Sequence, residues 1–189
     1  MSLDVAYIGH PILRKKARPI ERIDDSILVL IEQMKQLEKR RGNLIGLCAP
    51  QVGASIRLLI SWFGGTDPAT GRPMLGPAKI LINPELKDPS RETCIDDEGC
   101  ASVPKIYEPV ERPVAITVSY QDETGEHHTE RLEGYGARVI MHENDHLNGV
   151  LFIDRVDAKK KKQLTKYVEQ IKKHYKKHNE HLKIWDGEE

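Results

Sequence analysis

Two histidines and a glutamate, His142, Glu143 and His146, form the pattern H-E-x-x-H in the C-terminal half of the chain. Positions four apart lie on one face of an α-helix, so the two imidazoles could bind a single divalent metal ion. Glu143 would then lie beside a water on that metal, where a carboxylate can act as a general base. An alternative is an exposed helix that carries these residues by chance. We favour the metal site, because the pattern seldom arises by chance.

The motif leaves the third metal ligand open. Cys100 is flanked by small residues and could be reached by a ligand, and a thiolate with two imidazoles makes a plausible three-ligand set. The alternative is a small buried residue, which is what most free cysteines are. Glu169 is the main downstream carboxylate, although it lies in a lysine-rich segment. A pattern with a third histidine fails, because Phe152 stands where that histidine would be.

A run of small residues with a single glutamine, residues 44–53, precedes the first expected buried strand. Gly46 in this run would allow the backbone to approach a substrate closely. Gln51 could donate its amide to an oxyanion as charge develops there. The alternative, which the local sequence alone favours, is a tightly packed strand and turn with a structural amide. Cys48 and Cys94 are interpreted as small buried residues.

Apolar periodicity and turn residues indicate the elements that must position these side chains. Helices are expected over residues 25–41, 137–147 and about 157–178, strands over 3–8, 56–62, 80–82, 114–120 and 126–132, and a surface loop over 64–78. Gly134 and Gly136 are expected to precede the H-E-x-x-H helix, and Asn148 to end it. His127 and His128 are neighbours in a strand, so they point to opposite faces and suit no common metal.

The last expected helix has two different faces. Its apolar stripe would contain Leu164, Tyr167, Val168, Ile171 and Tyr175, and its other face would carry Lys159, Lys160, Lys161, Lys162, Lys166, Lys172, Lys173, Lys176 and Lys177. A lysine face is most often only solvated. The alternative is that it contacts RNA phosphates, with a binding affinity that falls as salt rises.

Composition points to one globular domain over residues 1–189, with 158–189 as a basic C-terminal helix and tail. Hydrophobic residues make up 39% and charged residues 31%, and the formal net charge of +0 gives no reason to expect a DNA or membrane partner. No secretory signal or run of transmembrane length is visible. Three cysteines cannot all pair within the chain, which favours a reducing cytoplasm.

Three motifs occur here in the order found in one known family. Residues 46–51 match the end of G-x-G-x-A-A-x-Q, residues 98–102 match E-G-C-x-S, and residues 142–146 match H-E-x-D-H. Residues 9–14 also look like the N-terminal segment of that family. On these motifs the chain resembles the peptide deformylases, which remove the formyl group from the N-terminal formyl-methionine of new proteins. The resemblance runs from end to end.

The resemblance implies an α+β fold, with small antiparallel sheets around a central H-E-x-x-H helix and with N-terminal and C-terminal helices. It implies one divalent metal ion, typically Fe²⁺ with Zn²⁺ or Ni²⁺ as substitutes, and N-formylmethionyl nascent peptides as substrates. It assigns metal binding to Cys100, His142 and His146, general base catalysis to Glu143, oxyanion binding to Gln51 and the Ala101 backbone N–H, and contacts with the substrate methionine to Ile45, Gly46 and Val139.

Four positions depart from the family pattern. Leu44 replaces a glycine and Cys48 an alanine in the first motif, Ala101 replaces a leucine in the second, and Met141 replaces the glutamine before the first histidine. These changes concern the pocket width near Leu44 and the hydrogen bonds near Met141. Two alternatives therefore stay open beside an active deformylase: another H-E-x-x-H metallopeptidase, or a weakly active or non-catalytic ribosome-associated homologue.

Overall fold

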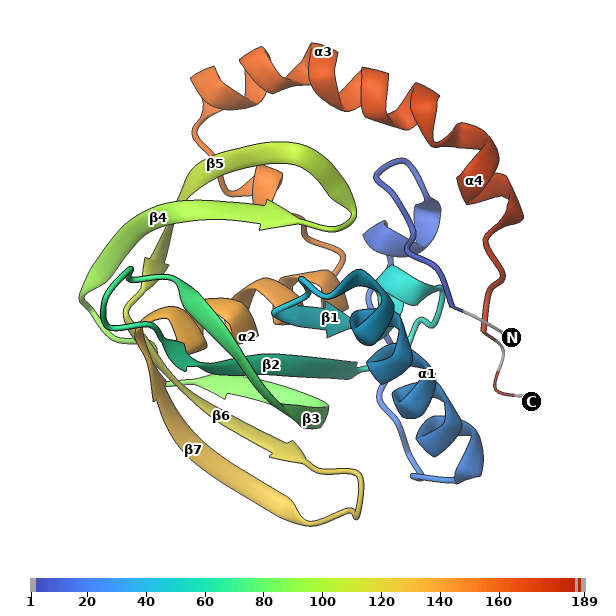
Figure 1. Cartoon of the computed structure of the whole chain (residues 1–189), viewed down its shortest axis with the longest axis vertical. Helices are drawn as coiled ribbons and strands as arrows, with labels where there is room; N and C mark the ends of the chain where they lie inside the picture. The colour runs from blue at the N-terminus through green and yellow to red at the C-terminus, as the bar shows by residue number, and fades with distance from the viewer. Residues whose placement is uncertain (1–2, 186, 188–189) are drawn as a thin grey trace.

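The computed structural model describes residues 3–185 and 187, which form an α+β fold (Figure 1). The elements in chain order are η1 (Pro11–Arg14), α1 (Asp25–Arg41), β1 (Gly46–Cys48), η2 (Ala49–Val52), β2 (Leu58–Thr66), β3 (Pro73–Lys87), β4 (Thr93–Cys100), β5 (Val103–Pro113), β6 (Ala115–Gln121), β7 (His127–Glu133), α2 (Gly134–Leu147), η3 (Phe152–Asp154), α3 (Ala158–His174) and α4 (Lys176–His181). One antiparallel sheet has the order β1-β2-β3-β6-β7, and β4 pairs with β5 in a separate antiparallel hairpin. The predicted fold class is confirmed.

Helix α2, which carries the H-E-x-x-H residues, lies at the centre of the fold between the five-stranded sheet and the β4–β5 hairpin (Figure 1). Nine of its 14 residues are buried, as expected of a helix that is covered on several sides. The helix begins at Gly134, so the expectation that Gly134 and Gly136 precede it is wrong. Gly134 has a φ of 55°, which lets the chain turn directly from β7 into the helix.

Helix α1 has the expected boundaries and packs against the β1 side of the molecule. The Asp24 carboxylate accepts hydrogen bonds from the backbone N–H groups of Ser26 and Ile27, so Asp24 is the N-cap. At the other end Gly42 has a φ of 67° and closes the helix in the left-handed conformation. Its apolar face is buried and consists of Ile27, Leu30, Ile31, Met34 and Leu37.

The segment expected as a surface loop, residues 64–78, instead extends a long hairpin of β2 and β3. Strand β3 also continues past Asn83, although the strand was expected to end at residue 82. Asn83 takes a φ of 52° at a shift in register, and its side-chain amide exchanges two hydrogen bonds with the Ile20 backbone at 2.7 and 2.8 Å. These bonds fix an irregularity inside the strand. Asn83 and Pro84, a pair that usually ends a strand, therefore lie within this one and interrupt its regular pairing.

The N-terminal segment expected as a strand is extended, but it forms no regular ladder. The Ala6 N–H donates to the Gln51 carbonyl at 2.7 Å, and the Ile8 N–H donates to the Ser102 carbonyl at 2.8 Å. These two isolated bonds link the segment to two different stretches of the chain. The segment therefore contacts both Gln51 and the turn that follows Cys100.

The expected C-terminal helix is divided into α3 and α4 at Tyr175. Leu164 is buried, and Val168 and Ile171 pack partly buried against the same apolar cluster. Tyr167 is 60% exposed, so its assignment to the apolar stripe is wrong. Among the described residues, no helix is both long enough and apolar enough to cross a membrane.

Candidate active site

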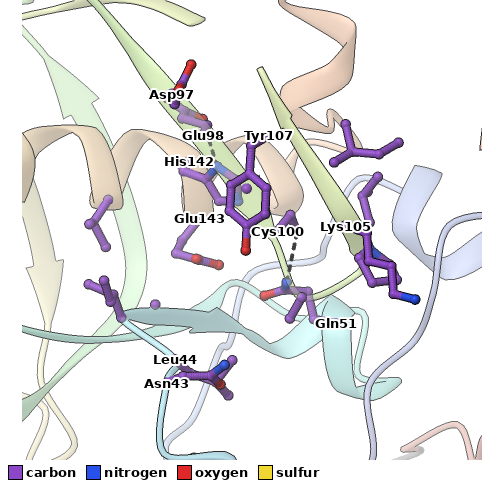
Figure 2. Close-up of a pocket in the computed structure, with 18 of the residues that line it drawn as sticks. Asn43, Leu44, Gln51, Asp97, Glu98, Cys100, Lys105, Tyr107, His142 and Glu143 are labelled. Carbon is purple, nitrogen blue, oxygen red and sulfur yellow. Dashed lines mark hydrogen bonds and ion pairs between the residues drawn. The ribbon is translucent and has the colours of Figure 1, made fainter. Parts of the chain in front are cut away.

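Cys100, His142 and His146 meet at the centre of the molecule, although Cys100 comes from the end of β4 and both histidines come from α2. Their candidate ligand atoms all lie within 4.8 Å of one another. The Cys100 Sγ lies 3.3 Å from the His146 Nε2, and the two imidazole centroids lie 5.2 Å apart. Figure 2 shows Cys100, His142 and Glu143 around one hollow, with the Gln51 amide next to Cys100. One small ion could therefore contact a sulfur and two nitrogens at once.

The His142 ring is oriented by a buried carboxylate. Its Nδ1 lies 2.8 Å from the Glu98 Oε2, so the Nδ1–H donates there and leaves Nε2 for a ligand. Arg112 donates to Glu98 through Nε at 2.5 Å and Nη2 at 2.8 Å, and the Arg138 Nη1 donates at 2.8 Å. Burial alone would raise the pKa of Glu98, but the hydrogen bonds from Arg112 and His142 hold this pKa well below its usual value.

A second buried carboxylate, Asp145, joins the same network. Arg112 donates to Asp145 through Nη1 at 2.9 Å, and Arg155 pairs with Asp145 through both of its guanidinium donors. The chain pattern alone gave no role to Glu98, Asp145 or Arg112. Two of these residues had a sequence signal, because Glu98 opens the E-G-C motif and Asp145 is the fourth residue of H-E-x-D-H. Arg112 had none, since only the fold brings it between the two carboxylates.

Glu143 lies in the same hollow, and burial sets its acidity. Its side chain is buried, and the Oε2 atom has no hydrogen-bond partner among the described residues. Burial raises the pKa of Glu143 to about 7, against the opposing effect of the nearby His142. Gly46 leaves space for this carboxylate, because a Cβ on Gly46 would lie 2.5 Å from the Glu143 Oε1. A carboxyl group with such a pKa can both accept and release a proton near neutral pH.

Gln51 has its amide oriented by neighbouring polar groups. The Cys48 backbone N–H donates to the Gln51 Oε1 at 2.9 Å, which directs the Nε2 toward the site. That Nε2 lies 3.4 Å from both the Cys100 Sγ and the Ser102 Oγ. The Gln51 amide is therefore both packed in the fold and directed toward the hollow, so the two alternatives for this residue are compatible. Cys48 is buried as expected, whereas Cys94 is exposed and the expectation for it is wrong.

The residues present fit a bound metal cation. The Cys100 thiol and two imidazoles are a usual donor set for Zn²⁺ and other soft or borderline divalent ions. Burial, and then the neighbouring His142, lower the pKa of His146, so its imidazole is neutral and able to bind a metal. Burial opposes a charge on His142, yet the contacts with Cys100 and Glu98 raise its pKa well above the usual value. Cys100 and Glu98 therefore stabilise a positive charge at the position of the His142 ring, which borders the candidate metal site.

The hollow opens into a cleft of about 520 Å³. Ile45, Gly46, Val139 and Ala101, the residues expected around the substrate, all line it together with Leu44. Met141 packs in an apolar cluster, and the hydrogen bond that supports His142 comes from Glu98 instead. Glu169 lines a different cavity and pairs with Lys172 at 2.7 Å, away from the three candidate ligands.

A family model described as polypeptide deformylase matches residues 2–162, which is more than four fifths of the chain. The chain belongs to the polypeptide deformylase family. It is similar to a peptide deformylase of Synechocystis, with 44% identity over 155 residues that cover 82% of this chain and 79% of the relative.

Solved deformylase structures resemble this one over most of their length. An Arabidopsis thaliana peptide deformylase superimposes with a TM-score of 0.80 at 34% identity, covering 93% of this chain and 92% of that one. A deformylase of Acinetobacter baumannii, solved with Met-Ala-Ser bound, gives a TM-score of 0.75 at 33% identity and covers 82% and 99%. The protein is therefore a metal-dependent hydrolase that removes the formyl group from the N-terminal formyl-methionine of nascent polypeptides.

Proposed function

We propose that Cys100, His142 and His146 hold the metal ion of this deformylase and that Glu143 is its general base. The observation that carries the proposal is the unpartnered, buried Glu143 Oε2 beside the converging sulfur and nitrogen atoms. A buried carboxylate oxygen without a partner is costly unless the site supplies one in use, such as a water or a substrate group. Glu143 is thus held ready to take a proton from the attacking water.

The remaining chemistry is divided among the side chains that line the cleft. The bound cation would supply Lewis-acid polarisation and lower the pKa of a water. Glu143 would accept a proton from that water and pass it to the methionine amine as the formyl C–N bond breaks. The Gln51 Nε2 and the Ala101 backbone N–H would donate hydrogen bonds to the formyl oxygen as it gains negative charge. Ile45, Gly46 and Val139 would hold the methionine residue.

Formyl-Met-Ala-Ser is a suitable test substrate, because its product is the peptide bound in the A. baumannii relative. Glu143→Gln keeps the volume of the side chain but removes its capacity as a base. We expect kcat to fall by about two orders of magnitude or more, the usual scale for acid–base catalysis, with metal content unchanged. Glu32→Gln, on the exposed face of α1, is the matched control. Turnover near wild type at full metal occupancy would remove Glu143 from the role of base.

We further propose Fe²⁺ as the native metal, with Zn²⁺ or Ni²⁺ able to replace it. One thiolate with two imidazoles suits all three ions, so supply and oxidation state decide the occupant. Protein purified without oxygen should contain about one iron per chain, and Cys100→Asp should weaken or change the bound metal. Glu169→Ala should leave the metal content unchanged. Loss of metal with Glu169→Ala, but not with Cys100→Ala, would overturn the ligand set.

A single domain over residues 1–189, acting in the cytoplasm where nascent chains emerge, is also part of the proposal. Its basic C-terminal part, residues 158–189, would contact ribosomal RNA phosphates through Lys172, Lys173, Lys176 and Lys177. Lys173 and Lys177 are exposed, whereas Lys172 pairs with Glu169 at 2.7 Å and Lys176 lies 3.9 Å from Glu180. Lys173 and Lys177, whose ammonium groups have no partner among the described residues, are therefore expected to carry most of the effect.

Sedimentation with ribosomes at increasing salt tests this contact. Changing these four lysines to glutamine should weaken ribosome binding and flatten its dependence on salt, because fewer counterions are released. Hydrolysis of free formyl-Met-Ala-Ser should stay the same, since the four residues lie outside the catalytic cleft. Equal ribosome binding by the mutant and the wild type at low salt would show that the lysines only solvate the helix.

A further inference from the structure

The cleft that holds the candidate catalytic residues continues to an end built of aromatic and basic side chains. Tyr7, Arg41, Lys105 and Tyr175 line the same cavity as Cys100. We infer that this end binds the nascent peptide beyond its methionine and favours an acidic side chain there. The inference rests on the proposed function, and it adds a preference among substrates that the catalytic residues do not impose.

Lys105 supplies a positive charge without a partner at this end. It is exposed, and its ammonium makes no hydrogen bond or ion pair with the residues that the structure describes. The ladder between β4 and β5 changes register after the Gly99–Tyr107 pair, because Cys100 pairs next with Val103. Residues 104–106 therefore bulge out of the hairpin with Lys105 at their centre. Figure 2 shows Lys105 beyond Cys100 and Gln51, at the side of the cleft away from Asp97.

The backbone at Lys105 is strained. Its φ of 65° lies in the left-handed region, which a residue with a Cβ rarely adopts. Glycine or asparagine would take this conformation at lower cost, so the local geometry gives no reason for a lysine. Strain of this kind is concentrated at sites that contact ligands. The strained backbone and the unpaired ammonium together indicate that Lys105 is there to meet an anionic group.

Arg41 places a second, partly offset positive charge on the lining of the same cleft. Its Nη2 donates to the Tyr7 hydroxyl at 3.1 Å and lies 3.4 Å from the Asp4 Oδ1. Asp4 is about half exposed, so it offsets part of the Arg41 charge. The acidic groups farther along the cleft are Asp97, Glu98 and Glu143, and arginines already neutralise Glu98. The charge along the cleft therefore becomes positive toward the Lys105 end.

The segment that follows α3 forms the aromatic wall of this end. The rings of Tyr7 and Tyr175 stack with their centroids 3.7 Å apart. The Asn179 side chain accepts from the Tyr7 N–H and donates to the Tyr7 carbonyl, both at 3.0 Å, while His178 contacts the Val5 carbonyl at 2.9 Å. These bonds fix Tyr175 at the cleft. The family match covers residues 2–162, so Tyr7 lies inside it, whereas Tyr175, His178 and Asn179 lie outside it.

Charge complementarity selects an acidic peptide side chain as the occupant. Tyrosine faces pack well on an extended peptide backbone, and they leave the side chains to decide specificity. A carboxylate near Lys105 in a half-open cleft would gain a modest interaction that salt screens. We expect a glutamate at the favoured position to raise kcat/KM by about twofold to fivefold over glutamine, the range of an exposed ion pair.

Pentapeptide amides that begin with formyl-methionine provide the test. Each carries a single glutamate, glutamine or lysine at the third, fourth or fifth position, and the amide end removes the terminal carboxylate. For each position, the ratio of kcat/KM for glutamate to that for glutamine is measured at low salt and at about 1 M salt, where the Debye length is about 3 Å. The variants are Lys105→Gly, which removes the charge and relieves the strained backbone, Lys105→Gln, and the control Lys162→Gln on α3.

We expect a ratio of about two to five at one position in the wild type and in Lys162→Gln, and a ratio near one in both Lys105 variants and at high salt. A ratio near one at every position in the wild type, or a preference that survives in Lys105→Gly, overturns the inference. The glutamine peptides distinguish a failure of this inference from a failure of the proposed deformylase function. If they are hydrolysed without a preference for glutamate, only the inference fails, whereas no hydrolysis of any peptide removes the proposed function as well.

Discussion

Replacement of Glu98 by glutamine tests whether the buried charge network both holds the fold together and orients the metal site. The Glu98 carboxylate is 5% exposed and accepts four hydrogen bonds. Its Oε1 accepts from Arg112 and Arg138, and its Oε2 accepts from Arg112 and His142. The amide of glutamine keeps one acceptor oxygen and replaces the other with an NH₂ donor. Whichever way the amide is turned, two hydrogen bonds are lost and donors face donors.

The expected loss of stability follows from these contacts. Two lost hydrogen bonds to charged groups contribute about 1.5–3 kcal/mol each. Removing one member of a buried ion pair costs about 3–5 kcal/mol, because the remaining charges stay buried. We therefore expect Glu98→Gln to lower the free energy of unfolding by about 4 kcal/mol. If the NH₂ takes the place of Oε2, the His142 ring also loses its support, and metal binding should weaken by about tenfold to a hundredfold.

Urea unfolding of wild type and variant in the presence of a chelator measures the stability change, and metal titration measures the change in affinity. Glu32→Gln is the control, because Glu32 pairs with Lys35 on the helix surface and is 62% exposed. Such a surface pair contributes less than about 1 kcal/mol. A stability change for Glu98→Gln as small as that of the control would refute the reasoning from buried charge.

The difference in folding stability between the wild type and Glu98→Gln should depend on pH. The pKa of Glu98 is lowered in the folded state by its hydrogen bonds from Arg112 and His142, while the unfolded value is near 4.5. A lowered folded pKa contributes stability that is present above the unfolded pKa and is lost as the pH falls through the folded pKa. The stability difference between wild type and Glu98→Gln should therefore be constant above about pH 5 and shrink below about pH 4.5.

Two further predictions concern the catalytic cleft. Gln51→Ala should raise the barrier by about 3 kcal/mol and lower kcat more than it changes KM, since the amide acts on the transition state; a change in KM alone, in steady-state kinetics on formyl-Met-Ala-Ser, would contradict this. Gly46→Ala should lower kcat by about tenfold or more with metal content retained, because the new Cβ would lie 2.5 Å from the Glu143 Oε1; activity equal to wild type would show that the carboxylate moves aside freely.

The boundaries of α1, the end of α2 and the H-E-x-x-H face could be predicted from the sequence because they depend on local periodicity and caps. Asp24 and Gly42 bound α1 as expected, and Asn148 follows the end of α2. The outer part of the β2–β3 hairpin, residues 64–78, could not be predicted, because this glycine- and proline-rich stretch has no periodicity. Pairing between β2 and β3 overrides that weak local preference.

The candidate site was predictable as far as its motifs reach. Cys100 and the two histidines were expected together, and the fold brings their ligand atoms within 4.8 Å. Arg112 was not predictable, since its role arises only from the antiparallel register that sets β5 beside β4. Tyr175 was assigned to the apolar stripe of a continuous helix, whereas the helix breaks there and the ring turns to Tyr7. Long-range partners of this kind leave no periodic signal in the chain.

Docking of the β4–β5 hairpin and orientation of the metal ligands depend on the same buried charges. Arg112 on β5 bridges Glu98 on β4 and Asp145 on α2, and Glu98 in turn fixes His142. A hairpin that shifted along α2 would leave these buried charges unpaired, at a cost of several kcal/mol. The donor set therefore assembles only when the hairpin is seated, because Cys100 arrives with β4 and His142 is turned by Glu98. Changes at the hairpin should thus alter metal affinity even where they contact no ligand.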